Sequence, residues 1–177
     1  RIDYNKDGDH DPYGIVFVLK EDAEAILCNR LNPEPLILRA NVGEYVEVTL
    51  TNKITGPFHH DGTHGYPDVP VSAFFPTSKR ISMHAQLVEY DVRHSDGATV
   101  GFNLDQTIGP GESITYRWYI DQEFGAANLW DMADVRNHRH HGAFGMLIAE
   151  PRGSKYLHPK TRKEVETGSQ VIISTPI

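Results

Sequence analysis

The clearest pattern in the chain is a strict alternation of apolar and polar side chains between residues 44 and 52. One face carries Val46, Val48 and Leu50, and the other carries Tyr45, Glu47, Thr49 and Thr51. Alternation with a period of two is typical of a strand that buries one face and exposes the other. This segment is therefore predicted to be a half-buried strand.

Several other segments have a strand pattern. Residues 80–90 and 113–120 alternate, 36–41 follows a proline-rich break, and 15–19 and 142–148 are short apolar runs suited to burial. Residues 21–27 could form two helical turns or an irregular connection, and 171–175 resembles a strand that begins a following unit. Glycine and proline together make up 26 of the 177 residues. Short strands between such turns favour an all-β sandwich or barrel.

Length and charge restrict the classes of protein and partner. A chain of 177 residues is long enough for one buried core and short for two. The net charge is -7 and the basic residues are dispersed, so nucleic acid is not expected as a partner. No stretch approaches the roughly 20 apolar residues of a membrane span. The chain begins at Arg1 and not at a methionine. We therefore interpret it as a processed or trimmed piece of a longer protein.

Cys28 is the single cysteine of the chain. One thiol excludes an internal disulfide and a cysteine-rich zinc module. Its neighbours Ile26 and Leu27 are apolar, so we expect Cys28 to be a small buried core residue.

A cluster of three histidines, His138, His140 and His141, lies directly before the apolar run 142–148. Imidazoles at this spacing are suitable ligands for copper, zinc or nickel. The alternative is that they make ordinary polar contacts at the end of a sheet, a role that imidazoles also serve. The spacing alone leaves both interpretations open.

Four further histidines could contribute to a metal site. His59, His60 and His64 lie in a long loop, and loops of this length in compact domains are usually functional or mobile. His84 lies on the alternating segment 80–90. Sequence spacing does not show whether these imidazoles meet, so a copper site built from them is a hypothesis.

The N-terminal segment has oxygen ligands at alternate positions, with Gly8 after the third: Asp3, Asn5, Asp7, Asp9 and Asp11. This pattern resembles the first half of a calcium loop. The second half departs from it, because Gly14 stands where a bidentate glutamate is expected. A calcium site and an acidic, turn-rich surface segment are the two interpretations.

Six motifs occur in one order along residues 30–153. They are Pro35 to Gly43, Val46 to Asn52, Arg80-Ile81-Ser82-Met83-His84, Ser95-Asp96-Gly97-Ala98, Pro110-Gly111-Glu112 before Trp118-Tyr119, and Gly142 to Gly153. Together they resemble a cupredoxin domain of a multicopper oxidase, of the large bacterial type related to manganese(II) oxidases and to ceruloplasmin. The resemblance implies an all-β fold, a cupredoxin-like Greek-key β-sandwich with long loops.

The resemblance also implies a domain organisation and a function. Residues 1–29 would be an acidic segment with a leading strand, 30–153 the cupredoxin-like domain, and 154–177 a linker and the start of a following unit. Such oxidases oxidise metal ions or small organic molecules at a type 1 copper and reduce dioxygen at a trinuclear copper cluster. The expected partners are further cupredoxin domains or chains of the same oxidase, located outside the cell, in the periplasm or at the cell surface.

The sequence departs from this family at the copper ligands. At the first His-X-His position the chain reads His84-Ala85-Gln86, and at the second it reads Leu129 to Asp134 with no histidine or cysteine. We therefore expect a domain that lacks complete type 1 and trinuclear sites and is not catalytic alone. The remaining histidines could form an accessory copper site. The alternatives are a non-catalytic module that binds a partner or serves as a spacer, and a metal-sequestering protein.

Overall fold

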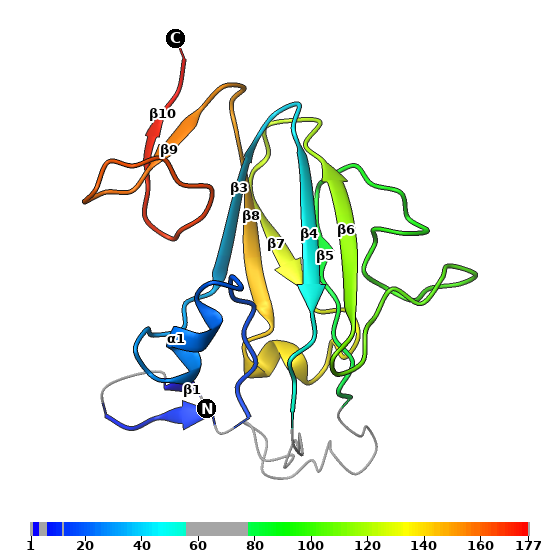
Figure 1. Cartoon of the computed structure of the whole chain (residues 1–177). Coiled ribbons are helices and arrows are strands. Elements are labelled where there is room, and N and C mark those ends of the chain that lie inside the picture. Colours follow the sequence, from blue (N-terminus) through cyan, green and yellow to red (C-terminus); the bar gives the residue numbers. More distant parts are fainter. Residues whose placement is uncertain (1, 4–6, 12, 56–77, 177) are drawn as a thin grey trace.

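The sheets of this protein form two layers, seen in a computed structural model that describes residues 2–3, 7–11, 13–55 and 78–176. A four-stranded sheet has the order β3 (Leu36–Asn41), β8 (Phe144–Glu150), β7 (Gly125–Trp130) and β5 (His84–Ala85). The second layer is the antiparallel pair of β4 (Tyr45–Thr51) and β6 (Ser113–Tyr119) (Figure 1). The chain alternates between the two layers at every step from β3 to β7, which gives a sandwich with crossing connections.

Strand β3 pairs with β8 in parallel, whereas β5, β7 and β8 pair in antiparallel fashion. The parallel pairing requires close contact near its start. A Cβ atom added to Gly145 would lie 2.7 Å from the carbonyl oxygen of Leu36, so only glycine fits there. The first and last long strands of the sandwich are thereby held side by side.

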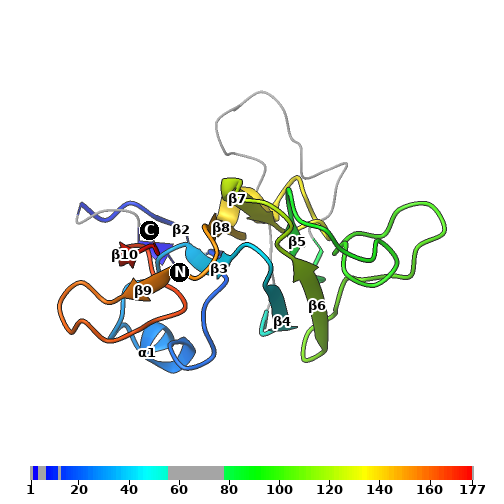
Figure 2. The ribbon, with the colours of Figure 1, turned by 90° about the horizontal axis from the view of Figure 1, so that it is seen from above.

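The core lies between the layers, where inward side chains of β6 meet those of β7 and β8. Figure 2 shows the two layers from above, with β4 and β6 beside the sheet that contains β7 and β8. Tyr116 and Trp118 are fully buried with stacked rings and pack in one cluster with Leu129 and Leu147. Their polar atoms are satisfied, since Tyr116 Oη donates to a backbone carbonyl at 2.6 Å and Trp118 Nε1 donates to the carbonyl of Ser95 at 3.0 Å. Buried aromatic side chains with a satisfied polar atom are strong core components.

These observations confirm the predicted all-β, cupredoxin-like sandwich and the strands at 36–41, 44–52, 113–120 and 142–148. In β4 the exposed and partly buried side chains alternate along its whole length, as the sequence predicted. Gly142, at the bend before β8, has a left-handed conformation with φ of 104°, which glycine adopts without strain.

Two strand predictions were wrong in whole or in part. Residues 15–19 form no strand, because this segment follows the end of the sandwich as an irregular connection that buries Phe17 and bonds Ile15 N to the carbonyl of His141 at 2.8 Å. In 80–90 the strand β5 covers two residues, with isolated bridges from Ile81 to Ile108 and from Glu89 to Tyr119. Leu87, with a positive φ of 62°, ends the extended conformation there.

The segment before β3 forms a short helix, α1 (Ala23–Leu27), outside the sandwich, and none of its residues is buried. Cys28 follows this helix and is exposed. The prediction of a buried core cysteine was therefore wrong, because apolar neighbours on a peripheral helix do not face the core.

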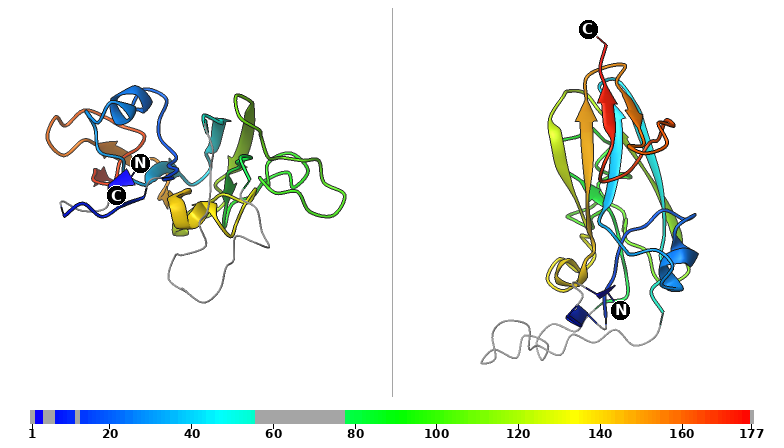
Figure 3. Two further views of the ribbon diagram at one scale, coloured as in Figure 1. Left: turned by 90° about the horizontal axis from the view of Figure 1, so that it is seen from below. Right: turned by 90° about the vertical axis from the view of Figure 1, so that its left-hand side faces the viewer.

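Each end of the chain forms a small two-stranded sheet, and the two sheets lie at opposite ends of the molecule. The N-terminal pair is β1 (Ile2–Asp3) with β2 (His10–Asp11), and β9 (Lys155–Leu157) pairs with β10 (Ile172–Ser174) (Figure 3). Residues 172–174, expected to open a following unit, thus pair with β9 within this chain, while the domain boundaries stay predictions. No helix in the described part of the chain is long and apolar enough to cross a membrane.

Candidate metal centre

His84 lies on β5, directly opposite Trp130 of β7. The two side chains therefore share the outer face of the four-stranded sheet. His84 Nδ1 lies 2.6 Å from the backbone oxygen of Asp96 and 3.2 Å from its carboxylate. An acceptor at Nδ1 places the proton of a neutral imidazole there and leaves the lone pair on Nε2, which is the arrangement that surrounds most metal-bound histidines.

A rigid turn holds Asp96 against His84. Gly97 has a φ of +76°, and a Cβ atom there would overlap the carbonyl of Met83, so the turn at 95–98 packs directly on the backbone before β5. Gly97 N also donates to Gln106 Oε1 at 3.0 Å. Tyr90 Oη donates to the Asp96 carboxylate at 2.8 Å. Burial, together with this carboxylate, raises the pKa of Tyr90 to about 12, so the phenol stays neutral and keeps its hydrogen bond.

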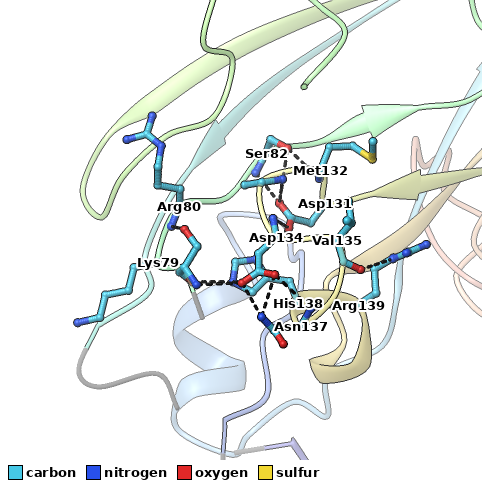
Figure 4. Close-up of polar contacts among 12 residues, drawn as sticks. Lys79, Arg80, Ser82, Asp131, Met132, Asp134, Val135, Asn137, His138 and Arg139 are labelled. Carbon is cyan, nitrogen blue, oxygen red and sulfur yellow. Dashed lines mark hydrogen bonds and ion pairs between the residues drawn. The ribbon is translucent and has the colours of Figure 1, made fainter. Parts of the chain in front are cut away.

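The three clustered histidines occupy a short 3₁₀ helix, His138–His141, before β8. His138 is fully buried, and both of its ring nitrogens face acceptors: Nδ1 lies 2.9 Å from Asp131 Oδ2 and Nε2 lies 2.7 Å from the carbonyl oxygen of Ser78 (Figure 4). Neither nitrogen has a lone pair left for a metal. The ring is instead suited to be an imidazolium that donates from both positions.

Asp131 is the centre of this buried network. Its carboxylate accepts backbone N–H bonds from Ser82 at 2.8 Å, Ala133 at 3.2 Å and Asp134 at 2.9 Å. Asp134 in turn accepts from Ser78 N at 2.9 Å (Figure 4). The network joins the strand region around β5 to the 3₁₀ helix.

The net effect of this environment is to raise the pKa of His138 above its usual value of 6.5. Burial is the largest influence and lowers the pKa, but the hydrogen bond and charge of Asp131, the Ser78 carbonyl and the charge of Asp134 outweigh it. Favouring the charged imidazole is the opposite of what metal binding requires.

His141 is also fully buried but faces a different carboxylate. Its Nδ1 lies 2.5 Å from Asp11 Oδ2, and Tyr13 N donates to the other oxygen of Asp11 at 2.7 Å. The ring of Tyr13 meets His141 edge to face. This contact attaches the N-terminal segment to the end of the sandwich.

The structure does not bring His138, His140 and His141 together. His138 and His141 face separate carboxylates, Asp131 and Asp11, and His140 is exposed. Within residues 2–3, 7–11, 13–55 and 78–176, no three histidine, cysteine or acidic side chains are placed to hold a metal ion. His59, His60 and His64 lie outside the described residues, so their part in a copper site stays a prediction.

The same holds for calcium. Asn5 lies outside the described residues, Asp3 belongs to β1, and Asp7 and Asp9 are exposed. The described residues do not form a calcium loop, and the calcium site stays a prediction.

The described residues do not fit a complete copper site of either type. Cys28, which follows α1, is exposed, and the stretch from Leu129 to Asp134, where a second histidine pair is expected, carries no histidine or cysteine. Asp131 is committed to His138. The described part of the chain thus offers one well-positioned imidazole, His84, where a cluster would require several.

Sequence reasoning missed the two carboxylates that bind the buried histidines. Asp131 interrupts an apolar segment at the end of β7, which is a sign of a buried acid with a required partner. Asp11 gave no such sign, since it lies among other acidic residues and its partner is 130 positions away.

The sequence and the fold were compared with known proteins. No protein-family model and no curated protein matches the sequence. Among solved structures, a copper nitrite reductase from Nitrosomonas europaea is 20% identical with a TM-score of 0.42, covering 69% of this chain and 31% of its own. Fet3p, described as a multicopper oxidase that functions in iron import, is 21% identical with a TM-score of 0.47, covering 71% and 19%.

A multicopper oxidase from Pseudomonas thermotolerans is 17% identical with a TM-score of 0.47, and the match covers 69% of this chain and 23% of the oxidase. The chain thus spans less than a third of the length of these similar structures. Two of these structures are described as multicopper oxidases and one as a copper nitrite reductase.

Proposed function

We propose that this chain is a cupredoxin-like domain of a larger, secreted multicopper oxidase that oxidises metal ions or small organic molecules with dioxygen. In this proposal the domain supplies a single imidazole, His84, to a copper site whose other ligands come from other domains or chains. The oxidase would act outside the cell, in the periplasm or at the cell surface.

The observation that carries the proposal is the fixed orientation of His84. Its Nδ1 is held by the Asp96 carbonyl at 2.6 Å, and its Nε2 has no hydrogen-bond partner in the part of the chain that the structure describes. The side chain is 19% exposed, so a partner surface can reach the ring. His138 and His141, in contrast, are buried against carboxylates.

Copper binding to the isolated chain tests the proposal. We expect at most one weakly bound Cu(II), with an electron paramagnetic resonance spectrum of nitrogen ligation and no blue thiolate absorption. His84→Ala should remove this copper, and His140→Ala, which changes an exposed imidazole, should keep it. Copper content that is unchanged in His84→Ala would refute the role of His84.

A second candidate is a non-catalytic cupredoxin module. Gln86 in place of a second histidine at the first pair position, and the lack of any histidine from Leu129 to Asp134, favour it. This candidate predicts that neither the isolated chain nor the chain joined to its neighbouring domains binds copper through His84. The same His84→Ala comparison, made in the longer protein, distinguishes the two.

A further inference from the structure

A hollow of about 550 Å³ lies beside the second layer of the sandwich, away from His84. One wall is the outer face of the β4–β6 pair, with Tyr45, Tyr119 and Arg117. The other is the segment 89–95, which contributes Glu89 and His94. The volume is within the range of small-molecule sites, roughly 300–1,000 Å³.

Both ends of the segment 89–95 are bonded to β6, so the hollow is preformed. Glu89 and Tyr119 exchange two backbone hydrogen bonds of 3.1 and 2.8 Å. At the other end, Ser95 Oγ accepts from Arg117 N at 3.1 Å. Between these points the segment bends away from the strand (Figure 1), and Asp91 closes the bend by accepting from the backbone N of Ser95 at 2.8 Å.

The β4–β6 wall combines aromatic rings with a fixed cation. The rings of Tyr45 and Tyr119 are 4.9 Å apart and tilted by 43°, and the Arg117 guanidinium lies 4.1 Å over the ring of Tyr45. Tyr45 is 58% exposed, which is unusual for a large aromatic side chain unless its exposed surface binds a ligand. The guanidinium presents several N–H donors in one plane.

The opposite wall supplies acceptors. The Glu89 carboxylate is exposed, and Asp91 holds the imidazole of His94 at 2.7 Å. An anionic ligand would be repelled by these carboxylates, and a cationic ligand by Arg117. A neutral ligand with many hydroxyl groups suits the hollow better, because each hydroxyl both donates and accepts hydrogen bonds.

From these features we infer that the hollow binds a neutral oligosaccharide. The tyrosine rings pack against the apolar face of a sugar ring, while Arg117 donates to, and Glu89 accepts from, its hydroxyl groups. The site is independent of copper and of the role proposed for His84.

Titration of the whole chain with cellohexaose, mannohexaose and chitohexaose, followed by backbone amide NMR, tests the inference. We expect at least one of them to shift the amide signals of Glu89 and Tyr119 in a saturable manner. Tyr45→Ala should weaken this binding by about five- to tenfold, and Glu89→Gln should also weaken it. Phe102→Ala, which removes a fully exposed aromatic ring elsewhere, should leave it unchanged.

Three results would overturn the inference. The first is that none of the three saccharides shifts the signals of the hollow. The second is that Tyr45→Ala, shown by its amide spectrum to be folded, binds them as the wild type does. The third is that a hexaglutamate or hexalysine peptide binds the same residues and the saccharides do not, since the site would then recognise charge.

Discussion

Two histidines near the C-terminal end of β7, His84 and His138, differ in what surrounds them. Beyond the C-terminal end of this strand, the 3₁₀ helix buries His138 with an acceptor at each ring nitrogen, at 2.9 and 2.7 Å. On the neighbouring strand β5, His84 has an acceptor at one nitrogen only. The first arrangement stabilises a cation within the fold, and the second orients a neutral ligand.

The difference shows why the number of histidines in a segment says little about metal binding. A metal needs a neutral imidazole with an available lone pair, and the acceptors at both ring nitrogens of His138, a carboxylate and a backbone carbonyl, prevent this. His138 and His141 therefore make structural contacts, whereas His84, with Nδ1 held by the backbone oxygen of Asp96, retains the chemistry of a ligand. The predictions below test this contrast through the free energy of unfolding.

The largest effect is expected for Asp131→Ala. This change removes the acceptor of His138 Nδ1 and of three backbone N–H groups, and the loss of one member of a buried ion pair costs about 3–5 kcal/mol. Urea denaturation of the purified chain measures it. Glu47→Ala, at an exposed carboxylate 3.9 Å from Arg117, is the control and should change stability by under about 0.5 kcal/mol. Equal effects of the two changes would contradict the structural role of His138.

A smaller loss of stability is expected for Asp11→Ala. The Asp11 carboxylate accepts from His141 and from Tyr13 N, whereas that of Asp131 binds His138 and three backbone N–H groups. Removal of a charged hydrogen bond to a buried group costs about 1.5–3 kcal/mol. The amide of Ile15, which bonds to the His141 carbonyl at 2.8 Å, should also exchange faster with solvent. Hydrogen exchange measures this local opening, and Glu21→Ala at an exposed site is the control.

Unchanged exchange at Ile15 in a folded Asp11→Ala variant would show that the N-terminal segment is held by other contacts. In that case the pair of His141 and Asp11 would stabilise the 3₁₀ helix alone.

The pH dependence of stability distinguishes a charged His138 from a neutral one. Its pKa is raised in the folded state, so its contribution is fully present below the unfolded value of about 6.5 and is lost as the pH rises through the folded pKa. The difference in unfolding free energy between wild type and His138→Gln should therefore be largest near pH 6 and should narrow at higher pH. A difference that widens with pH would mean that His138 is buried as the neutral ring.

The parts of the fold that could be predicted are those with a local pattern. The alternation of β4 depends on burial of one face and appears directly in the sequence, and β6 follows the same rule. Residues 80–90 alternate as well, yet the strand β5 covers only His84 and Ala85, and Leu87 beyond it adopts a positive φ that no local pattern encodes.

The candidate site was predictable only at His84, through its motif. The roles of His138 and His141 depend on Asp131 and Asp11, which approach them only in the folded chain. The contact between His141 and Asp11 spans 130 positions. The sequence around a histidine that binds a carboxylate does not differ from the sequence around one that binds a metal. Sequence spacing therefore identified the residues but not their partners.

The smallest effect on stability is expected where the proposed function depends most on one side chain. His84→Ala removes one hydrogen bond at a partly exposed position, which costs about 1 kcal/mol, far less than His138→Ala, which leaves Asp131 buried without its cation. Thermal or urea denaturation of both variants measures the difference. Replacing a structural histidine should lower the free energy of unfolding and leave copper binding unchanged. Replacing a copper ligand should remove copper binding and change the free energy of unfolding little. If His84→Ala destabilises the chain as much as His138→Ala, the two regions serve the same structural purpose, and His84 has no separate role as a ligand.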